Sequence, residues 1–346
     1  MAFIVVFVLT LILTWAVKKL ALYFNIVDNP PAGSESRKIH QKPIPLLGGL
    51  AIFLGFFFTL GIVYLWQPQI FEHLYPAQLW ALFIGSTVLM LGGFLDDKYN
   101  FKPWQQFIFP VVAVLLVLYG GINLTKITNP FGGTINLDFF RVGGRLVAVD
   151  ALVFVWLLGL TYTTKILDGL DGLVTGLTAI GSLMIFFLAS TEKFYQPDVA
   201  LVALIFAGAN LGFLIFNFYP AKIFLGEGGS LLTGFVLGFL AIAAGGKIAT
   251  TLLVMGLPAL DVLATIIRRF WAKRSPTQSD AGHLHYRLLQ KGFSQRQAVV
   301  FYYSLAVIFG ILTLFLQSRQ KFWALLVLAL VAFMVIIKFN YQVKKV

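Results

Sequence analysis

Long apolar segments, each of about 20 residues and therefore able to cross a bilayer, recur along this chain and are separated by short polar connections. About eleven such segments predict membrane-spanning helices. The eighth contains several glycines, which favour either loose helix ends or close packing between helices. The predicted spans lie near residues 2–24, 46–66, 77–95, 104–121, 147–166, 172–190, 199–218, 230–245, 248–267, 298–317 and 322–340.

Composition agrees with this pattern. Of the 346 residues, 59% are hydrophobic and only 12% are charged, whereas a soluble domain carries about a quarter charged residues. We therefore expect an all-α polytopic membrane protein, with residues 1–346 forming a single integral-membrane domain. The chain has no cysteine, which excludes disulfides, thiol nucleophiles and thiolate metal sites. The first segment ends in Lys18 and Lys19 without a cleavage site, so we expect a retained helix.

The net charge of +12 would suggest nucleic acid binding in a soluble protein. Here the basic residues gather in short connections, so anionic membrane lipids or nucleotides are the expected partners, and no nucleic acid. Most of them follow the odd-numbered spans. Because basic loops stay inside the cell, we expect an external N-terminus and a cytoplasmic C-terminus in a bacterial-type plasma membrane. The external connection near 122–146 alternates apolar and polar residues, which predicts a short β-hairpin.

Acidic residues collect on the same predicted cytoplasmic side, where topology does not require them. In the segment KILDGLDG, Asp168 and Asp171 are three residues apart, which on a helix places both carboxylates on one face. A glycine follows each aspartate, so backbone or a phosphate can approach closely. Two interpretations remain open: a divalent-metal site facing an anionic substrate, or a solvated loop between helices.

Asp96 and Asp97 end the third predicted span. Neighbouring residues on a helix point about 100° apart, so we expect the two acids to have different roles. One would hold a metal ion, and the other would take a proton from the acceptor. The alternative is that both are solvated beside Lys98 and Lys102.

Glu227 lies in a glycine-rich turn before the eighth span. A helix N-terminus attracts anions, so a carboxylate there is interpreted as a ligand for a metal that bridges to phosphate. Asn217 is an amide near the membrane edge, and its hydrogen-bond partner can equally be a ligand or the backbone. Further upstream, the basic segment 37–49 with His40 is a candidate phosphate contact, although basic loops beside membranes are common.

The last long connection contains His283, His285 and Arg287. The two histidines are not at zinc-helix spacing, and the chain has no cysteine, so a structural zinc site is not expected. The interpretations are that these residues contact phosphate or sugar, or that they belong to a surface amphipathic helix over 284–292. Asp261, inside the ninth span, is predicted to pair with Arg268 or Lys165, because intramembrane acids usually have such a partner.

The order of these motifs resembles a known family. RKIHQKPIP, FLDDK, DGLDGL, FNFYPAK, FLGEGGS and HLHYRLL follow one another as in the bacterial polyprenyl-phosphate N-acetylhexosamine-1-phosphate transferases. The first and last motifs look more like the N-acetylglucosamine branch than the muramoyl-pentapeptide branch. The resemblance implies transfer of a sugar 1-phosphate from a UDP-sugar to undecaprenyl phosphate, with release of UMP and Mg²⁺ or Mn²⁺ as cofactor. Such a reaction starts a cell-envelope polysaccharide such as lipopolysaccharide.

Carried over to this chain, the resemblance assigns roles to the same residues. The loops 25–45, 96–103, 165–171, 218–229 and 268–297 would form the active site. Asp96, Asp97, Asp168 and Asp171 would be catalytic, and Glu227, Asp97 and Asp171 would bind metal. The expected substrate-binding residues are His40, Lys165, Asn217, His283, His285 and Arg287.

Four positions depart from the family pattern. Tyr162 and Lys165 stand where asparagines are usual, Glu227 replaces an aspartate, and Tyr286 replaces a histidine. Lys165 would either contact a diphosphate directly or repel Mg²⁺. These departures suggest a subfamily with a different sugar or nucleotide, or a non-catalytic homologue that binds nucleotide-sugar or lipid carrier. A transporter is a further alternative, although its acids would lie nearer the midplane. Apolar faces for lipid and for a second protomer look alike, so a homodimer stays open.

Overall fold

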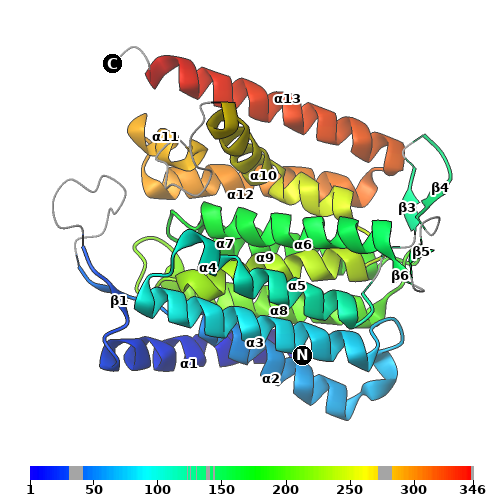
Figure 1. Cartoon of the computed structure of the whole chain (residues 1–346), viewed down its shortest axis with the longest axis horizontal. Coiled ribbons are helices and arrows are strands. Elements are labelled where there is room, and N and C mark those ends of the chain that lie inside the picture. The colour runs from blue at the N-terminus through cyan, green and yellow to red at the C-terminus, as the bar shows by residue number, and fades with distance from the viewer. Residues whose placement is uncertain are drawn as a thin grey trace.

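The computed structural model describes residues 1–30, 42–122, 124, 126–129, 131–137, 141–142, 145–271 and 283–343. Most of its long helices lie side by side, with their axes close to one common direction (Figure 1). The helices are α1 Ala2–Tyr23, α2 Gly48–Trp66, α3 Pro76–Tyr99, α4 Pro103–Gln106, α5 Ile108–Tyr119, α6 Val147–Leu167, α7 Leu173–Ala189, α8 Pro197–Asn217, α9 Gly226–Ala243, α10 Ile248–Trp271, α11 Leu284–Gln290, α12 Gln295–Phe315 and α13 Ser318–Val343.

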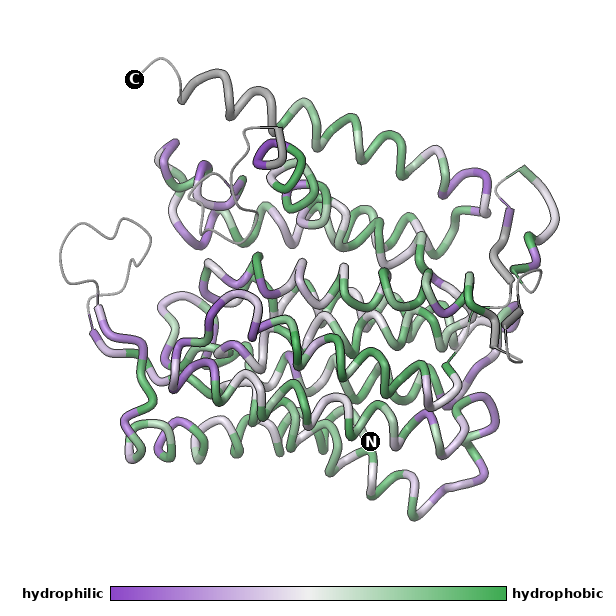
Figure 2. Tube along the Cα trace, in the orientation of Figure 1, coloured by the Kyte–Doolittle hydropathy of each residue, from purple (hydrophilic) through white to green (hydrophobic). Residues whose placement is uncertain are grey.

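Nine helices in the described part of the chain are long and apolar enough to cross a membrane. Two further apolar stretches, Pro103–Tyr119 and α7, are shorter. The prediction of a helical, multi-pass membrane protein is confirmed, and every predicted apolar segment falls on a helix. Figure 2 shows apolar residues along the lengths of the helices and hydrophilic residues mainly at the two ends of the bundle.

Short antiparallel strand pairs lie at these two ends. At one end, β1 (Val27–Asp28) pairs with β2 (Ile44–Pro45), a pairing that the sequence pattern did not indicate. At the other end, β3 (Lys126–Thr128) pairs with β4 (Thr134–Asn136) inside the connection where a hairpin is expected. β5 (Arg141–Val142) and β6 (Arg145–Leu146) form a third pair there. We name the two ends of the bundle the β1 end and the β3 end (Figure 1).

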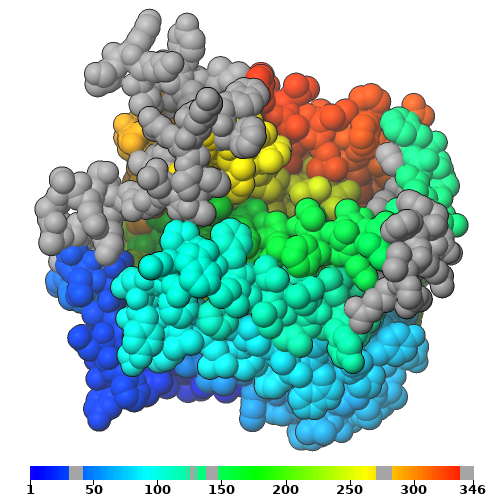
Figure 3. All heavy atoms as spheres, viewed as in Figure 1, coloured from blue at the N-terminus to red at the C-terminus, as the bar shows by residue number. Residues whose placement is uncertain are grey.

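Helix α9 is the centre of the bundle. In its apolar window 89% of the residues are buried, compared with 22% for α1 and 11% for α13. It packs against α2, α3, α6 and α7, while α1 and α13 lie at opposite edges of the molecule (Figure 3). Because α9 begins at the β1 end and is surrounded by protein, its first turn can carry side chains into an enclosed site.

Glycine pairs allow this close approach. A Cβ atom on Gly93 of α3 would lie 2.0 Å from the backbone nitrogen of Gly228. A Cβ atom on Gly49 of α2 would lie 2.1 Å from the Cα of Gly229. The start of α9 therefore packs backbone to backbone against two neighbours, the contact that small residues permit between membrane helices.

This packing predicts the effect of Gly93→Ala. The added methyl must push α3 and α9 apart, so we expect a loss of about 1–3 kcal/mol in stability, the usual effect of overpacking. Thermal unfolding in detergent measures the loss. Gly61→Ala in α2 is the matched control, since its Cβ would have no neighbour within 4 Å; equal unfolding temperatures for the two variants would contradict the prediction.

Candidate active site

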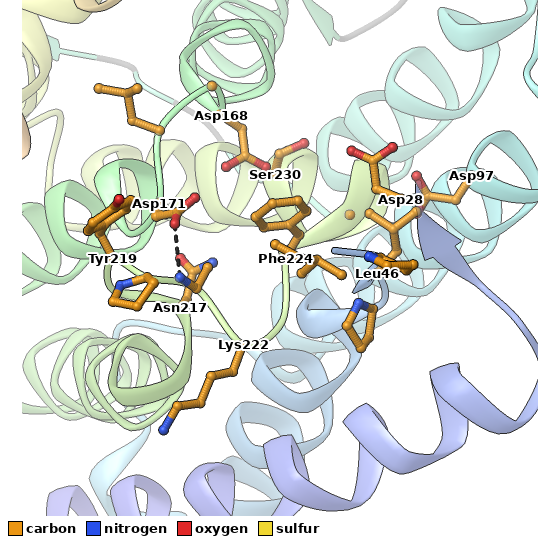
Figure 4. A pocket seen from close by; sticks show the side chains of 18 of the residues that line it. Asp28, Leu46, Asp97, Asp168, Asp171, Asn217, Tyr219, Lys222, Phe224 and Ser230 are labelled. Atoms are coloured by element: carbon orange, nitrogen blue, oxygen red, sulfur yellow. Dashed lines mark hydrogen bonds between the residues drawn. The ribbon is translucent and has the colours of Figure 1, made fainter. Parts of the chain in front are cut away.

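A cavity of about 940 Å³ opens at the β1 end. Its walls come from the end of α1, the β1–β2 pair, the end of α3, the α6–α7 turn and the α8–α9 connection. Figure 4 shows Asp168 and Asp171 on one side, Asp28 and Asp97 on the other, and Phe224 and Ser230 between them. The carboxylates of its lining are Asp28, Asp97, Asp168, Asp171 and Glu227. The ammonium groups are those of Lys18, Lys42, Lys165 and Lys222.

The structure joins the FLDDK and FLGEGGS motifs directly. The backbone N–H of Glu227 donates to both carboxylate oxygens of Asp97, at 3.2 and 3.1 Å. Gly226 adopts a positive φ of 73°, and a Cβ there would lie 2.7 Å from Asp97 Oδ2. The glycine thus fits both the left-handed backbone and the contact. Asp97 caps the start of α9 and lines the cavity with Glu227.

Asp96 has different surroundings. Its carboxylate is 8% exposed and accepts hydrogen bonds from the Phe101 backbone N–H at 2.7 Å and from Gln106 Nε2 at 3.3 Å. It is not among the residues that line the cavity. The two adjacent acids therefore face different environments, as their helical spacing requires. The catalytic role expected for Asp96 stays a prediction, beside a clear structural role in closing the turn after α3.

The DGLDG turn between α6 and α7 supplies Asp168 and Asp171. Burial raises the pKa of Asp168 to about 8, and the negative charges of Glu227, Asp171 and Asp97 add to the effect. Asp171 Oδ2 accepts a hydrogen bond from the backbone N–H of Ala221 at 2.9 Å. This contact ties the α6–α7 turn to the α8–α9 connection and so fixes two walls of the cavity together.

Lys165 forms an ion pair with Glu227 inside the cavity. Its ammonium also donates to Gln106 Oε1 at 2.9 Å. Tyr162, one turn earlier, is not part of the cavity lining; its ring packs on Phe107, with ring centroids 4.7 Å apart. Of these two departures from the family pattern, only the lysine brings new chemistry to the cavity.

Asn217 has its hydrogen bonds satisfied by protein. Its Nδ2 donates to the Ile223 carbonyl at 3.0 Å, and its Oδ1 accepts from the Thr175 hydroxyl at 2.8 Å. Both polar atoms thus have protein partners, and Asn217 also lines the cavity. The side chain holds the α8–α9 connection, and its expected contact with substrate stays a prediction.

Asp261 contacts the start of α11, and its expected pairing with Arg268 stays a prediction. Its carboxylate accepts from the Leu284 backbone N–H at 3.1 Å, and its Oδ2 lies 3.1 Å from His283 Nδ1. Lys165, one of the expected partners, is engaged by Glu227. Asp261 therefore anchors the first residues of α11, which the sequence did not indicate because the two segments are 22 residues apart.

The histidine segment lies behind the DGLDG turn. His285 is fully buried, and burial lowers its pKa to about 3, so the ring is neutral. A Cβ on Gly169 would lie 2.7 Å from His285 Nε2 and 2.7 Å from the Tyr286 hydroxyl. Tyr286 lines the cavity, whereas His283, His285 and Arg287 are buried beside it. Their contacts with substrate stay predictions, and His40 lies outside the described residues.

Three cavity lysines were missed by sequence analysis. Lys18 ends α1, Lys42 precedes β2 and Lys222 follows the turn after α8. Lys18 and Lys222 served only to predict orientation, and Lys42 was considered only as part of the basic segment 37–49, because charge counts along the chain do not show which loops meet in space. Asp28 was missed for the same reason.

The cavity's donor set fits a hard divalent cation. Among the described residues, no three His, Asp or Glu side chains already stand close enough together to hold a metal ion. However, the carboxylates of Asp97, Asp168, Asp171 and Glu227 repel one another, and such oxygen ligands suit Mg²⁺. Lys165 supplies the neighbouring positive charge to Glu227, so a bound cation would share or displace that contact.

The known proteins that this chain resembles are sugar-phosphate transferases that act on polyprenyl phosphates. The family model described as Glycosyl transferase family 4 matches residues 79–245. The chain is 32% identical to a probable undecaprenyl-phosphate N-acetylglucosaminyl 1-phosphate transferase of Bacillus subtilis, over 97% of this chain and 90% of the relative. It is 30% identical to a decaprenyl-phosphate N-acetylglucosaminephosphotransferase of Mycolicibacterium smegmatis, over 86% and 76%. An Escherichia coli undecaprenyl-phosphate alpha-N-acetylglucosaminyl 1-phosphate transferase is 29% identical, over 98% and 89%.

The anchoring role of Asp261 can be tested by exchange of backbone amides. Asp261→Ala removes the charged acceptor of the Leu284 N–H, a contact worth about 2 kcal/mol. We expect amide exchange across α11 to become about 30-fold faster, because a loss of about 2 kcal/mol raises the equilibrium constant for local opening by about that factor. Glu192→Ala, an exposed acid at the β3 end, is the control. Unchanged exchange in Asp261→Ala would refute the anchoring role.

Proposed function

Because this chain belongs to glycosyl transferase family 4, we propose that it transfers N-acetylglucosamine 1-phosphate from UDP-N-acetylglucosamine to a polyprenyl phosphate and releases UMP. The matches to known proteins confirm the family resemblance that the motifs indicate. One structural observation supports the proposal most: acids and lysines from widely separated segments converge in one cavity, at one end of the apolar helices. Such a cavity suits two phosphate-bearing substrates, one of them held in the membrane.

The orientation and the full number of spans are part of this proposal. We place the β1 end in the cytoplasm, where nucleotide-sugars are made, because the basic connections at that end predict it. The short helices of Pro103–Tyr119 and α7 would then complete eleven spans. The start of α1 would lie outside and the end of α13 inside.

The reaction balances as a phosphoryl transfer. A phosphate oxygen of the lipid forms a bond to the β-phosphorus of the nucleotide-sugar, and the bond between that phosphorus and the oxygen of UMP breaks. A phosphate monoester is already largely ionised near neutral pH, so the acceptor needs positioning more than a strong base. In this proposal Asp97 orients the acceptor, while Asp168 and Asp171 hold the donor.

Positive charge must balance the phosphates. The ammonium groups of Lys18, Lys42, Lys165 and Lys222 line the same cavity and can bind the diphosphate and the lipid phosphate. When bound, Mg²⁺ would supply further charge neutralisation, held by Glu227, Asp97 and Asp171. Tyr286 and the turn at Gly169 close the cavity on the side of α11.

The direct test uses purified protein with undecaprenyl phosphate and a panel of UDP-N-acetylhexosamines, and measures UMP release with Mg²⁺, Mn²⁺ or EDTA. Metal-dependent release with UDP-N-acetylglucosamine is the expected result. Binding of UDP-sugars without release from any donor would favour a non-catalytic homologue instead.

Site variants test the roles of the carboxylates. Glu227→Gln and Asp97→Asn keep the side-chain shape but lose the charge, so we expect UMP release to fall by about 10²–10³, the usual loss for an electrostatic group at a reacting centre. Asp150→Asn at the β3 end of α6 is the control and should keep full activity. Full release by correctly folded Glu227→Gln would defeat the assignment.

Lys165→Gln separates the two roles considered for this lysine. If its ammonium binds the diphosphate, KM for the nucleotide-sugar should rise about tenfold, the value of one charge-assisted hydrogen bond. If it instead opposes the metal, the Mg²⁺ concentration for half-maximal activity should fall. We expect the rise in KM, since Lys165 enters the cavity; Lys98→Gln at the exposed end of α3 is the matched lysine control.

A further inference from the structure

Three lysines gather at the β3 end, far from the cavity. Helix α9 separates the two places: Glu227 lies in its first turn and Lys247 follows its end. The helix has 18 residues and is therefore about 27 Å long. Lys193 belongs to the α7–α8 connection and Lys321 to the first turn of α13. Three segments that are remote in sequence thus bring ammonium groups to one place.

Three contacts show how the cluster is built. Lys247 Nζ lies 3.3 Å from the centre of the Phe194 ring, and Lys193 Nζ lies 5.6 Å from the same centre. Lys321 Nζ donates to the Thr250 hydroxyl at 3.2 Å. The ring and the hydroxyl hold the three ammonium groups near one another without neutralising them.

Within the described residues, the cluster lacks a carboxylate. No acidic oxygen there lies within 4.0 Å of the three ammonium groups. Of the two acids in or beside the α7–α8 connection, Glu192 is exposed, and Asp198 accepts hydrogen bonds from the backbone N–H groups of His73 and Leu74, at 2.6 and 2.7 Å. Burial, together with the charges of Lys321 and Lys193, lowers the pKa of Lys247 to about 8. The like charges repel, so an anion bound among them would stabilise the arrangement.

The position of the cluster indicates which anion. Lys321 lies in the first turn of α13, and the opposite face of the same helix carries the exposed apolar side chains Trp323, Val327 and Leu330. Figure 2 shows the change from a hydrophilic helix start to an apolar length. Exposed apolar side chains of this kind face lipid chains, so the first turn of α13 and its ammonium group lie at the depth of lipid headgroups. Among anions, the phosphate of a membrane lipid is the one held at this depth.

We propose that Lys193, Lys247 and Lys321 form a binding site for the phosphate of an anionic membrane lipid, in the leaflet opposite to the cavity. The phosphate oxygens accept charge-assisted hydrogen bonds from the ammonium groups. This site does not depend on the reaction at the β1 end.

The test measures lipid binding to the detergent-purified full chain by native mass spectrometry. Phosphatidylglycerol should bind more tightly than phosphatidylcholine, and each of Lys247→Gln and Lys321→Gln should weaken its binding about fivefold, the contribution of one lysine near an anionic surface. Arg319→Gln, an exposed charge two residues from Lys321, should leave binding unchanged. Lys247→Arg keeps the positive charge and should preserve it, which separates loss of charge from a folding defect.

Three outcomes would overturn the site. Equal affinity for phosphatidylglycerol and phosphatidylcholine would show that headgroup charge is not recognised. Unchanged phosphatidylglycerol binding in the Lys193→Gln, Lys247→Gln, Lys321→Gln triple variant would place the lipid elsewhere. Displacement of phosphatidylglycerol by inorganic phosphate at the same concentration would assign the cluster to a free anion instead.

Discussion

The buried start of α9 is the constraint on which the site depends. A helix N-terminus leaves backbone N–H groups without partners, and here it is enclosed by α2 and α3. The carboxylate of Asp97 accepts the N–H of Glu227, and glycines let the three backbones touch. Once this packing is fixed, Asp97 and Glu227 must lie together. The remaining walls of the cavity then follow from the segments that pack around them.

The sequence predicted the helices well because the bilayer imposes a length and a composition on each of them. Every apolar segment corresponds to a helix, and the acids of DGLDG and FLGEGG line one cavity with Asp97 of FLDDK. What could not be predicted depends on contacts between remote segments. Asp261 pairs with the start of α11, Asn217 bonds to Ile223 and Thr175, and the cavity lysines come from separate loops. The pattern of apolar and polar residues along one helix does not indicate which other helix or loop will pack against it.

The departures from the family pattern acquire different meanings in the fold. Tyr162 packs against Phe107 outside the cavity, so its size affects the α4–α6 contact rather than the chemistry. Lys165 places a fixed positive charge against Glu227, where a divalent cation would compete with the ammonium group for the same carboxylate. Tyr162 and Lys165 both stand where the family usually has asparagine, but the tyrosine affects packing and the lysine affects charge.

The double role of Asp97 has a consequence for how the site responds to its contents. The same two oxygens that accept the α9 N–H also face the cavity. A ligand that binds these oxygens and draws them away from the Glu227 N–H destabilises the first turn of α9. Because such coupling is reciprocal, unfolding of this turn changes the ligand's binding free energy by the same amount. Occupancy at one end is thereby communicated to the central helix of the bundle.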